Sequence, residues 1–357
     1  MIVKSDKKTK VALVAPSLPV IGGQSIQARS LFDAFQNDDK NELTFIPNNP
    51  KNFGQKIRFV RTLTTSLTFW VSLFRMLRNV DIVHIFSSGT TSYVISTLPP
   101  LLIAKFYGKK TILHYHTGEA ETHLKNWRKS VQTMRYFDRI IVPSQFLVEV
   151  FARFSLQTNA ISNFVETEKF RFQKRESLRP IFLSNRNFEP HYQVADVLRA
   201  FSLIQKKICN AHLMLIGSGH QEADLKKLAA ELQLKNVEFV GRVEPNMMPE
   251  YYNKSDIYLN SSIVDNMPLS IIEAFCCGLP VVTTNAGGIP YIVEHERNGL
   301  VVNVNDYSAL ADAATRLLEN NELAQKLIAE AHHDGVKCSW SQVRAHWVRS
   351  YEELASE

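Results

Sequence analysis

The sequence predicts an α/β protein of two doubly wound domains that face each other across a cleft. Short apolar runs without charge alternate with amphipathic helical patterns along the whole 357-residue chain. Glycine turns follow several of these runs, at the sheet edge where ligands bind in such folds. The two halves also differ in charge: residues 1–175 carry 25 Lys and Arg against 12 Asp and Glu, whereas residues 176–357 carry 16 against 23.

The first domain is expected over residues 1–170, followed by a charged linker over 166–179. Its buried strands are predicted at 11–16, 43–47, 81–86, 111–116 and 139–143. The first strand leads into Gly22-Gly23 and then a helix, which offers backbone N–H groups to a phosphate. A purely structural turn is the alternative for so short a match. Ser144 is the expected N-cap of a later helix.

Residues 55–79 predict a helix or helix pair in which Trp70 and Phe74 are mixed with four arginines. Such a helix can lie on a membrane surface, or it can pack on the core and leave a solvated basic face. The basic first half likewise suggests an anionic partner, either a membrane surface, a phosphorylated lipid or an acidic polymer. A solvated basic face without a partner is the alternative. No nucleic-acid partner is expected.

His116 ends the predicted strand 111–116 and is a candidate functional histidine. His114 lies two residues earlier on the same face of the strand, and His123 follows in the sequence. Three histidines so close together raise the possibility of a metal site. No carboxylate–histidine helix motif accompanies them, and a metal site is therefore not expected.

The second domain is expected over residues 176–338. Its strands are predicted at 180–185, 211–216, 237–241, 257–260 and 281–284, and a long helix at about 307–333. Gly217 and Gly219 follow the second of these strands. The tail, residues 339–357, predicts an amphipathic helix that packs back on the first domain.

The stretch from Ser261 to Asn305 is the most informative part of the chain. A helical pattern that begins near Leu269 carries Glu273 and must stop at Gly278, because Pro280 follows. Asp265 precedes this helix, so two carboxylates lie eight residues apart on one loop-helix element. After strand 281–284 comes a turn with Gly287-Gly288, then Ile289-Pro290 as a new helix start.

Composition excludes several classes of protein. The four cysteines have no paired spacing and indicate small buried residues in a reducing compartment. No secretory signal is visible, and the chain is expected to be cytoplasmic, with membrane association as an option. The uncharged stretch 62–74 is too short to span a bilayer, and the uncharged stretch 82–104 is interrupted by His84, Gly89 and two prolines.

These motifs together resemble the retaining GT-B glycosyltransferases of family 4, also known as glycosyl transferases group 1. The specific part is an acid and Glu273 separated by seven residues, followed by Gly-Leu-Pro-Val-Val, Gly-Gly-Ile-Pro and Asn-Gly-Leu segments between 278 and 300. Shorter matches occur in the family's order along nearly the whole chain. They are Gly22-Gly23, His116, Val142-Pro143-Ser144, the segment 163–170, Arg186, Gly217-Ser-Gly219 and Val240-Gly241.

The resemblance implies a GT-B fold and a nucleotide-diphosphate-sugar donor, a UDP-, GDP- or ADP-sugar, with no required cofactor or metal. It implies that Glu273 binds the ribose and Asp265 the donor sugar. The backbone of Asn266, Met267, Pro268 and Leu269 would face the sugar or diphosphate, and Gly217 belongs to the same donor site. Arg186 would bind the diphosphate, Gly22 and Gly23 would approach it from the first domain, and His116 would lie near the transferred sugar.

The chain departs from the family pattern in three places. Asp265 stands where the family usually has Glu, and Tyr291 replaces the Glu of the glycine-rich motif. The Lys that usually follows the arginine is missing from residues 187–193, where His191 is a candidate substitute. Both acids could instead have a purely structural role. Asp265 could be the N-cap of its helix, and Glu273 could be an acid on the helix surface.

We therefore expect a retaining hexosyltransferase that acts on a glycan or lipid-linked acceptor, in polysaccharide or glycoconjugate biosynthesis. Front-face attack is favoured over a covalent intermediate because no convincing nucleophile is seen. The missing Lys motivates one alternative, a catalytically weak sugar-nucleotide binder that acts as an assembly partner. A sugar-nucleotide epimerase or hydrolase on the same architecture is another.

Overall fold

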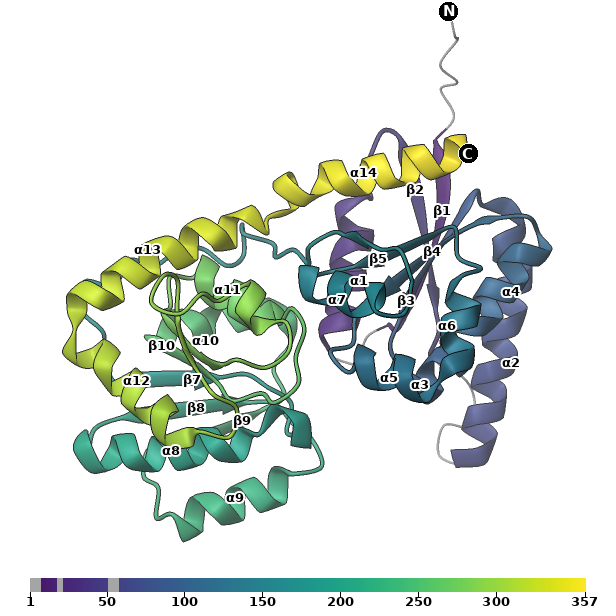
Figure 1. Cartoon of the computed structure of the whole chain (residues 1–357). Coiled ribbons are helices and arrows are strands. Elements are labelled where there is room, and N and C mark those ends of the chain that lie inside the picture. Colours follow the sequence, from purple (N-terminus) through teal and green to yellow (C-terminus); the bar gives the residue numbers. More distant parts are fainter. Residues whose placement is uncertain (1–7, 18–21, 51–57) are drawn as a thin grey trace, which may run out of the picture. The chain divides into compact units, whose positions relative to one another are not determined.

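The computed structural model describes residues 8–17, 22–50 and 58–357, with side chains of the helix that begins at residue 58 described from Thr64 onward. Two compact units divide the chain. The first is Met1–Ser162 with Val343–Glu357, and the second is Asn163–Gln342. Each contains a six-stranded parallel sheet flanked by helices (Figure 1), which confirms the predicted doubly wound architecture.

The first unit has the strand order β2-β1-β3-β4-β5-β6. Its strands are β1 (Thr9–Ala15), β2 (Asn41–Pro47), β3 (Ile82–Ser87), β4 (Lys110–Tyr115), β5 (Arg139–Val142) and β6 (Asn159–Ala160). Its helices are α1 (Gly23–Ala34), α2 (Arg58–Met76), α3 (Thr90–Ser92), α4 (Leu98–Phe106), α5 (Ala120–Asn126), α6 (Arg128–Met134) and α7 (Gln145–Ala152). The central strands are buried on both faces, which explains their uninterrupted apolar runs.

The second unit has the order β12-β11-β10-β7-β8-β9. Its strands are β7 (Ile181–Ser184), β8 (His212–Ile216), β9 (Val237–Gly241), β10 (Ile257–Asn260), β11 (Val281–Thr284) and β12 (Leu300–Val302). Its helices are α8 (Val194–Lys207), α9 (Glu222–Glu231), α10 (Met248–Lys254), α11 (Leu269–Cys276), α12 (Tyr307–Glu319) and α13 (Asn321–Lys337). Helix α8 packs beside α12, and α11 packs beside α13 (Figure 1).

The C-terminal helix α14 (Trp340–Ser356) contributes to the first unit from Val343 onward. Arg344 donates to Asp38 at 2.5 Å, and Lys40 donates to Glu352 at 2.6 Å. The buried Tyr351 lies 2.8 Å from the ring of His84 on β3. The amphipathic pattern of the tail therefore reflects a helix whose apolar side is covered by strands and helices of this unit.

Several local expectations are confirmed or corrected. Ser144 caps α7 by accepting from the Leu147 amide at 3.3 Å, as predicted. The single helix expected at 307–333 is wrong, because Asn320 caps a new helix by accepting from the Leu323 amide at 3.0 Å. The helix start at Ile289-Pro290 is only one 3-10 turn. Cys276 and Cys277 are buried as predicted, but Cys209 is exposed.

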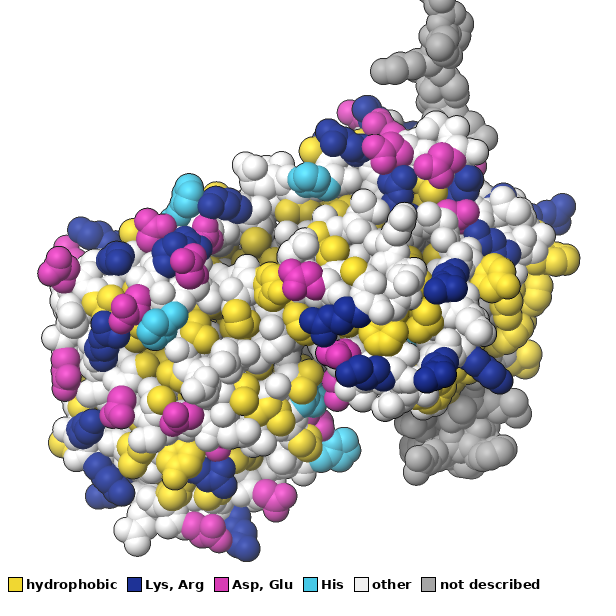
Figure 2. Space-filling model, viewed as in Figure 1, with side chains coloured by type: hydrophobic (Ala, Val, Ile, Leu, Met, Phe, Trp, Pro, Cys, Tyr) yellow, Lys and Arg dark blue, Asp and Glu magenta, His cyan; other side chains and the backbone are white. Residues whose placement is uncertain are grey.

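Helix α2 is apolar on two sides. Phe69, Leu73 and Leu77 are buried against the core, whereas Trp70 and Phe74 are exposed. Figure 2 shows hydrophobic side chains gathered along the edge of the first unit where Figure 1 places α2 and α4. Among the described residues, no helix is both long enough and apolar enough to cross a membrane.

Candidate functional site

The second unit has its topological switch point between β7 and β10. From β7 the chain continues through β8 and β9 on one side, and from β10 through β11 and β12 on the other. The loops after these two neighbouring parallel strands diverge at their carboxyl ends, which is the usual binding position in an open α/β sheet. Arg186 lies just after β7, and Asp265 lies in the loop after β10.

The guanidinium of Arg186 is held by three neighbours. It forms an ion pair with Asp265, donates to the Ser270 hydroxyl at 3.2 Å, and lies 4.0 Å from the centre of the Tyr192 ring. Burial alone would lower the pKa of Arg186, but the adjacent Asp265 carboxylate raises the net pKa above its usual value. The arginine therefore stays charged.

One donor of Arg186 is unsatisfied within the described part of the chain. Its buried Nε atom has no hydrogen-bond partner among the described residues. Leaving a buried N–H unsatisfied costs about 1–3 kcal/mol, and more when the group is charged. A phosphate oxygen could satisfy such a donor.

Glu273 is buried on α11 and accepts a hydrogen bond of 2.7 Å from the hydroxyl of Tyr252 on α10. Asn185 donates to the same hydroxyl at 2.8 Å and so fixes its orientation. Burial raises the pKa of Glu273 to about 7, although the bond from Tyr252 acts in the opposite direction. The alternative of a helix-surface acid is therefore wrong.

Helix α11 begins at Leu269 with Pro268 as its N-cap, without a side-chain cap and without an acidic residue in its first turn. Asp265 instead accepts from the Asn266 amide at 2.9 Å, so the alternative that Asp265 is the helix N-cap is wrong. The carbonyl of Met267 accepts from Asn163 at 3.0 Å. The uncapped, positive end of α11 lies on the segment 266–269 that the sequence nominated.

The glycine motifs of this unit permit close backbone packing. At Gly287, where φ is +50°, a Cβ atom would collide with the Asp265 carbonyl, and at Gly288 it would collide with the carbonyl of Asn266. The Gly288 amide also donates to the Asp265 carbonyl at 3.1 Å. A Cβ atom at Gly217 would likewise collide with the carbonyl of Arg186. These glycines position the two loops that carry Arg186 and Asp265.

The remaining candidates lie in the first unit. Gly22 is the N-cap of α1, Gly23 is its first residue, and a Cβ at either would meet nothing within 4 Å. His116 follows β4, and its ring stacks on Phe86 with centroids 5.0 Å apart. Burial lowers the pKa of His116 to about 3, so this side chain is neutral near pH 7 and can offer hydrogen bonds but not a positive charge.

The other histidines near His116 are core residues. His84 links the hydroxyl of Tyr351 to the ring of His114, at 2.8 and 3.2 Å. His123 lies between the hydroxyls of Tyr115 and Ser130, at 2.7 and 3.0 Å. Among the described residues no group of three or more His, Cys, Asp or Glu is arranged to hold a metal ion.

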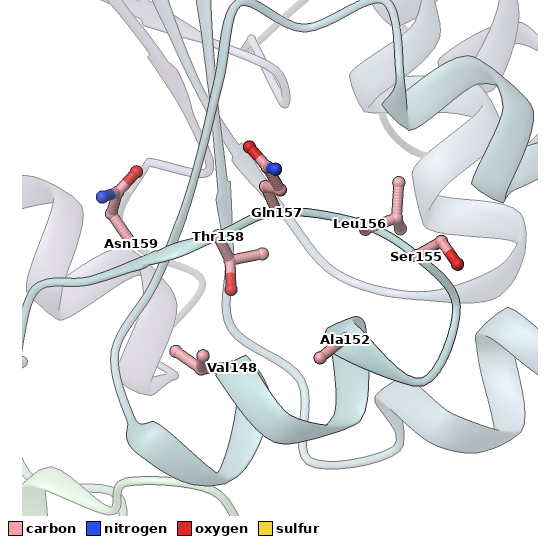
Figure 3. Close-up of a pocket in the computed structure, with 7 residues that line it drawn as sticks. All are labelled: Val148, Ala152, Ser155, Leu156, Gln157, Thr158 and Asn159. Carbon is pink, nitrogen blue, oxygen red and sulfur yellow. The ribbon is translucent and has the colours of Figure 1, made fainter.

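A cavity of about 590 Å³ lies elsewhere in the first unit, between α7 and the segment that leads into β6 (Figure 3). Its lining is Val148, Ala152, Ser155, Leu156, Gln157, Thr158 and Asn159. No charged side chain is among these residues, so the cavity cannot neutralise a diphosphate. It contains none of the residues nominated from the sequence.

The sequence did not nominate Tyr192, Tyr252 or Ser270, although all three contact the candidate side chains. Tyr192 lies 6 positions from Arg186, Tyr252 lies 21 positions from Glu273, and Ser270 lies 84 positions from Arg186. The adjacent tyrosines Tyr251 and Tyr252 in α10 are the one sequence feature that points to a contact by this helix. His191, the candidate replacement for the missing Lys, accepts through its backbone carbonyl from the Ile263 amide at 2.9 Å, beside the same loop.

Two family descriptions match consecutive parts of the chain. Glycosyltransferase Family 4 matches residues 21–169, and Glycosyl transferases group 1 matches residues 165–334. Among curated relatives, the N-acetyl-alpha-D-glucosaminyl L-malate synthase of Bacillus anthracis is 32% identical over 142 residues, which is 40% of this chain and 36% of that protein. The chain spans about a third of the length of the first curated relatives it matches.

Solved structures share the fold over nearly the whole chain. Sucrose-phosphate synthase from Thermosynechococcus elongatus has a TM-score of 0.80 at 19% identity, covering 98% of this chain and all of that one. Anabaena HepE in complex with UDP has a TM-score of 0.76 at 14% identity, covering 97% and 100%. The chain therefore has a GT-B fold, and its two halves match the Glycosyltransferase Family 4 and Glycosyl transferases group 1 descriptions.

Proposed function

We propose that this GT-B chain, whose halves match the family 4 and group 1 glycosyltransferases, transfers a sugar from a nucleotide-diphosphate-sugar to a hydroxyl acceptor. The observation that carries the proposal is the convergence of Arg186, Asp265 and Glu273 at the β7/β10 switch point. A cation and two acids there match the three polar parts of such a donor: diphosphate, sugar hydroxyls and ribose hydroxyls.

Each side chain has a chemical task in this proposal. Glu273, oriented by Tyr252, accepts from the ribose hydroxyls. Arg186 places its unsatisfied Nε donor and its charge toward the diphosphate, whose negative charge grows as the bond to the sugar breaks. Asp265 accepts from the sugar hydroxyls while it holds Arg186 in place. The positive end of α11 faces the same anionic groups.

The reaction exchanges one bond for another at the anomeric carbon. The bond from that carbon to the diphosphate oxygen breaks, the bond to the acceptor oxygen forms, and the acceptor proton passes to the leaving phosphate. We propose retention by front-face attack. A covalent route would need Asp265 as nucleophile, and a carboxylate already paired with an arginine is a weak one.

The acceptor in this proposal is a glycan or lipid-linked glycan, consistent with a role in polysaccharide or glycoconjugate synthesis. His116 and the Gly22–Gly23 turn are proposed to complete the site from the first unit. Gly22 and Gly23 have open space where a side chain would be, as a backbone that approaches phosphate requires.

A second candidate is a sugar-nucleotide binder that turns over slowly. The observation in its favour is that Arg186 is already neutralised in part by Asp265, while residues 187–193 contain no Lys. The diphosphate would then be left with less compensating charge than a fast transferase needs.

One experiment separates these functions. The chain is incubated with UDP-, GDP- and ADP-sugars, with and without a glycan acceptor, and release of the nucleoside diphosphate is followed. Acceptor-dependent release supports transfer, binding without release selects the slow binder, and an altered sugar or acceptor-independent release selects epimerase or hydrolase chemistry. Proton NMR of the product reports the anomeric configuration, and inversion would remove the retaining assignment.

A further inference from the structure

Helix α2 presents an apolar stripe to solvent. Leu67, Trp70, Val71 and Phe74 are 65%, 41%, 49% and 44% exposed. Their spacing of three and four residues places them on one side of the helix. Phe69 and Leu73 on an adjoining side of the helix are buried against the core, so apolar residues cover both the buried side and this exposed stripe.

A second exposed stripe joins the first. Leu102 and Phe106 on α4 are 63% and 76% exposed. Tyr107 connects the helices, since its hydroxyl donates to the Phe74 carbonyl at 3.2 Å and its ring contacts both Phe74 and Phe106. We call this surface the α2/α4 face, defined by Leu67, Trp70, Val71, Phe74, Leu102 and Phe106. Figure 2 shows it as the yellow margin of the first unit.

The surroundings of the α2/α4 face are positively charged. Residues 64–118, whose side chains the structure describes, contain five Lys and Arg but only one acid, Asp81. Arg75 in the last turn of α2 and Arg78 in the 3-10 turn Leu77–Asn79 that follows are both exposed, and neither forms an ion pair with any residue in the described part of the chain. Lys105 is the exception on α4, since it pairs with Asp138 at 2.6 Å.

The charge and the apolar area together indicate what binds to the α2/α4 face. A second copy of the chain would bring two positive surrounds together, which opposes a symmetric dimer through this face. A free acidic glycan would engage the arginines but leave the aliphatic side chains Leu67, Val71 and Leu102 in water. An anionic bilayer satisfies both, because Trp, Phe and Leu enter the headgroup boundary while Arg and Lys contact lipid phosphates.

We propose that the α2/α4 face docks the protein on an anionic lipid bilayer, with Trp70 and Phe106 inserted at the interface and Arg75 and Arg78 on lipid phosphates. This docking is independent of the proposed sugar transfer, because it needs neither donor nor acceptor. It holds the first unit against the surface on which a lipid-linked acceptor would be found.

Flotation of the full chain with vesicles tests the proposal. Phosphatidylcholine vesicles that contain phosphatidylglycerol should carry the wild-type protein, vesicles of phosphatidylcholine alone should carry much less, and added salt should weaken binding. Trp70→Ser combined with Phe106→Ser should reduce binding about tenfold or more, and Arg75→Glu combined with Arg78→Glu should do the same. Melting curves check that the variants fold.

Matched controls come from exposed residues of the second unit. Tyr307→Ser with Val336→Ser removes two exposed hydrophobic side chains, and Lys206→Glu with Lys227→Glu changes net charge equally. Both should bind vesicles like wild type. Brominated lipids should quench wild-type fluorescence more than that of Trp70→Phe.

Three outcomes would overturn the proposal: no binding to anionic vesicles, equal loss in face and control variants, or quenching that is unaffected by Trp70→Phe. A concentration-dependent dimer in sedimentation, lost in the Trp70→Ser/Phe106→Ser variant, would assign the face to a second copy instead.

Discussion

The hydroxyl of Tyr252 lies 2.7 Å from the buried carboxylate of Glu273 and donates to it. Burial favours the neutral acid, whereas this bond favours the carboxylate. Burial is the larger effect, so the pKa of Glu273 is raised to about 7. Glu273 is thus a partly ionised acceptor near neutral pH, at the place where we propose that the ribose binds.

Tyr252→Phe should weaken donor binding by about tenfold, because a hydrogen bond to a charged group contributes about 1.5–3 kcal/mol and its loss further disfavours the Glu273 carboxylate. The dependence of affinity on pH should move to higher pH in the same variant. Calorimetric titration with the nucleoside diphosphate that the wild-type protein binds, repeated at several pH values, measures the affinity and its pH dependence. Tyr251→Phe, on the neighbouring position of α10, is the matched control. An unchanged affinity for Tyr252→Phe would separate Tyr252 from the site.

Glu273 should also make stability depend on pH. Its pKa is raised from 4.5 to about 7 by folding, so the folded chain binds the proton more tightly than the unfolded chain. The resulting stabilisation is complete below pH 4.5 and is lost as pH rises through about 7, by on the order of a few kcal/mol. Melting temperature against pH should fall across this window and be flatter in Glu273→Gln. Glu319→Gln, at an exposed position, should retain the wild-type slope.

Arg186→Lys should lower kcat of transfer by about 100-fold, since it keeps the charge but removes the geometry that reaches Asp265 and Ser270 together. Steady-state kinetics with the preferred donor give the value. Arg199→Lys, at a more exposed arginine of α8, controls for the substitution itself. Wild-type kcat in Arg186→Lys would show that another group meets the diphosphate.

Gly287→Ala should destabilise the second unit by about 2–4 kcal/mol, because φ is positive there and a Cβ atom would collide with the Asp265 carbonyl. Gly22→Ala should leave stability nearly unchanged, because a Cβ there meets nothing within 4 Å. If Gly22 approaches the diphosphate, that variant loses transfer activity without losing stability. Thermal melts paired with activity assays distinguish the two glycines, and equal melting temperatures would refute the packing role of Gly287.

Much of the fold was predictable because buried parallel strands have uninterrupted apolar runs. The strands at 257–260 and 281–284 were predicted at their observed bounds, and Arg186 and Asp265 were placed at strand ends that the structure brings into contact. The short helices α5 and α6 were not predicted. The break between α12 and α13 was missed because an Asn320 cap interrupts an otherwise continuous helical pattern.

The supporting side chains of the site were beyond prediction for a physical reason. Tyr252 reaches Glu273 because α10 and α11 both pack against the sheet, and Tyr192 reaches Arg186 because a 3-10 turn follows β7. Such pairs depend on the packing of elements. The glycine motifs were visible, but their contact with the carbonyls of Arg186 and Asp265 depends on how neighbouring loops approach each other.

Binding of nucleoside diphosphate to wild type and to Glu273→Ala is the most direct test of the proposed donor site. Calorimetric titration with UDP, GDP and ADP identifies the nucleotide, and melting curves establish that the variant is folded. We predict a loss of about 100-fold or more, because two ribose hydroxyls lose a charged acceptor, with Glu319→Ala unchanged. A folded Glu273→Ala protein that binds the nucleotide with wild-type affinity would contradict the account.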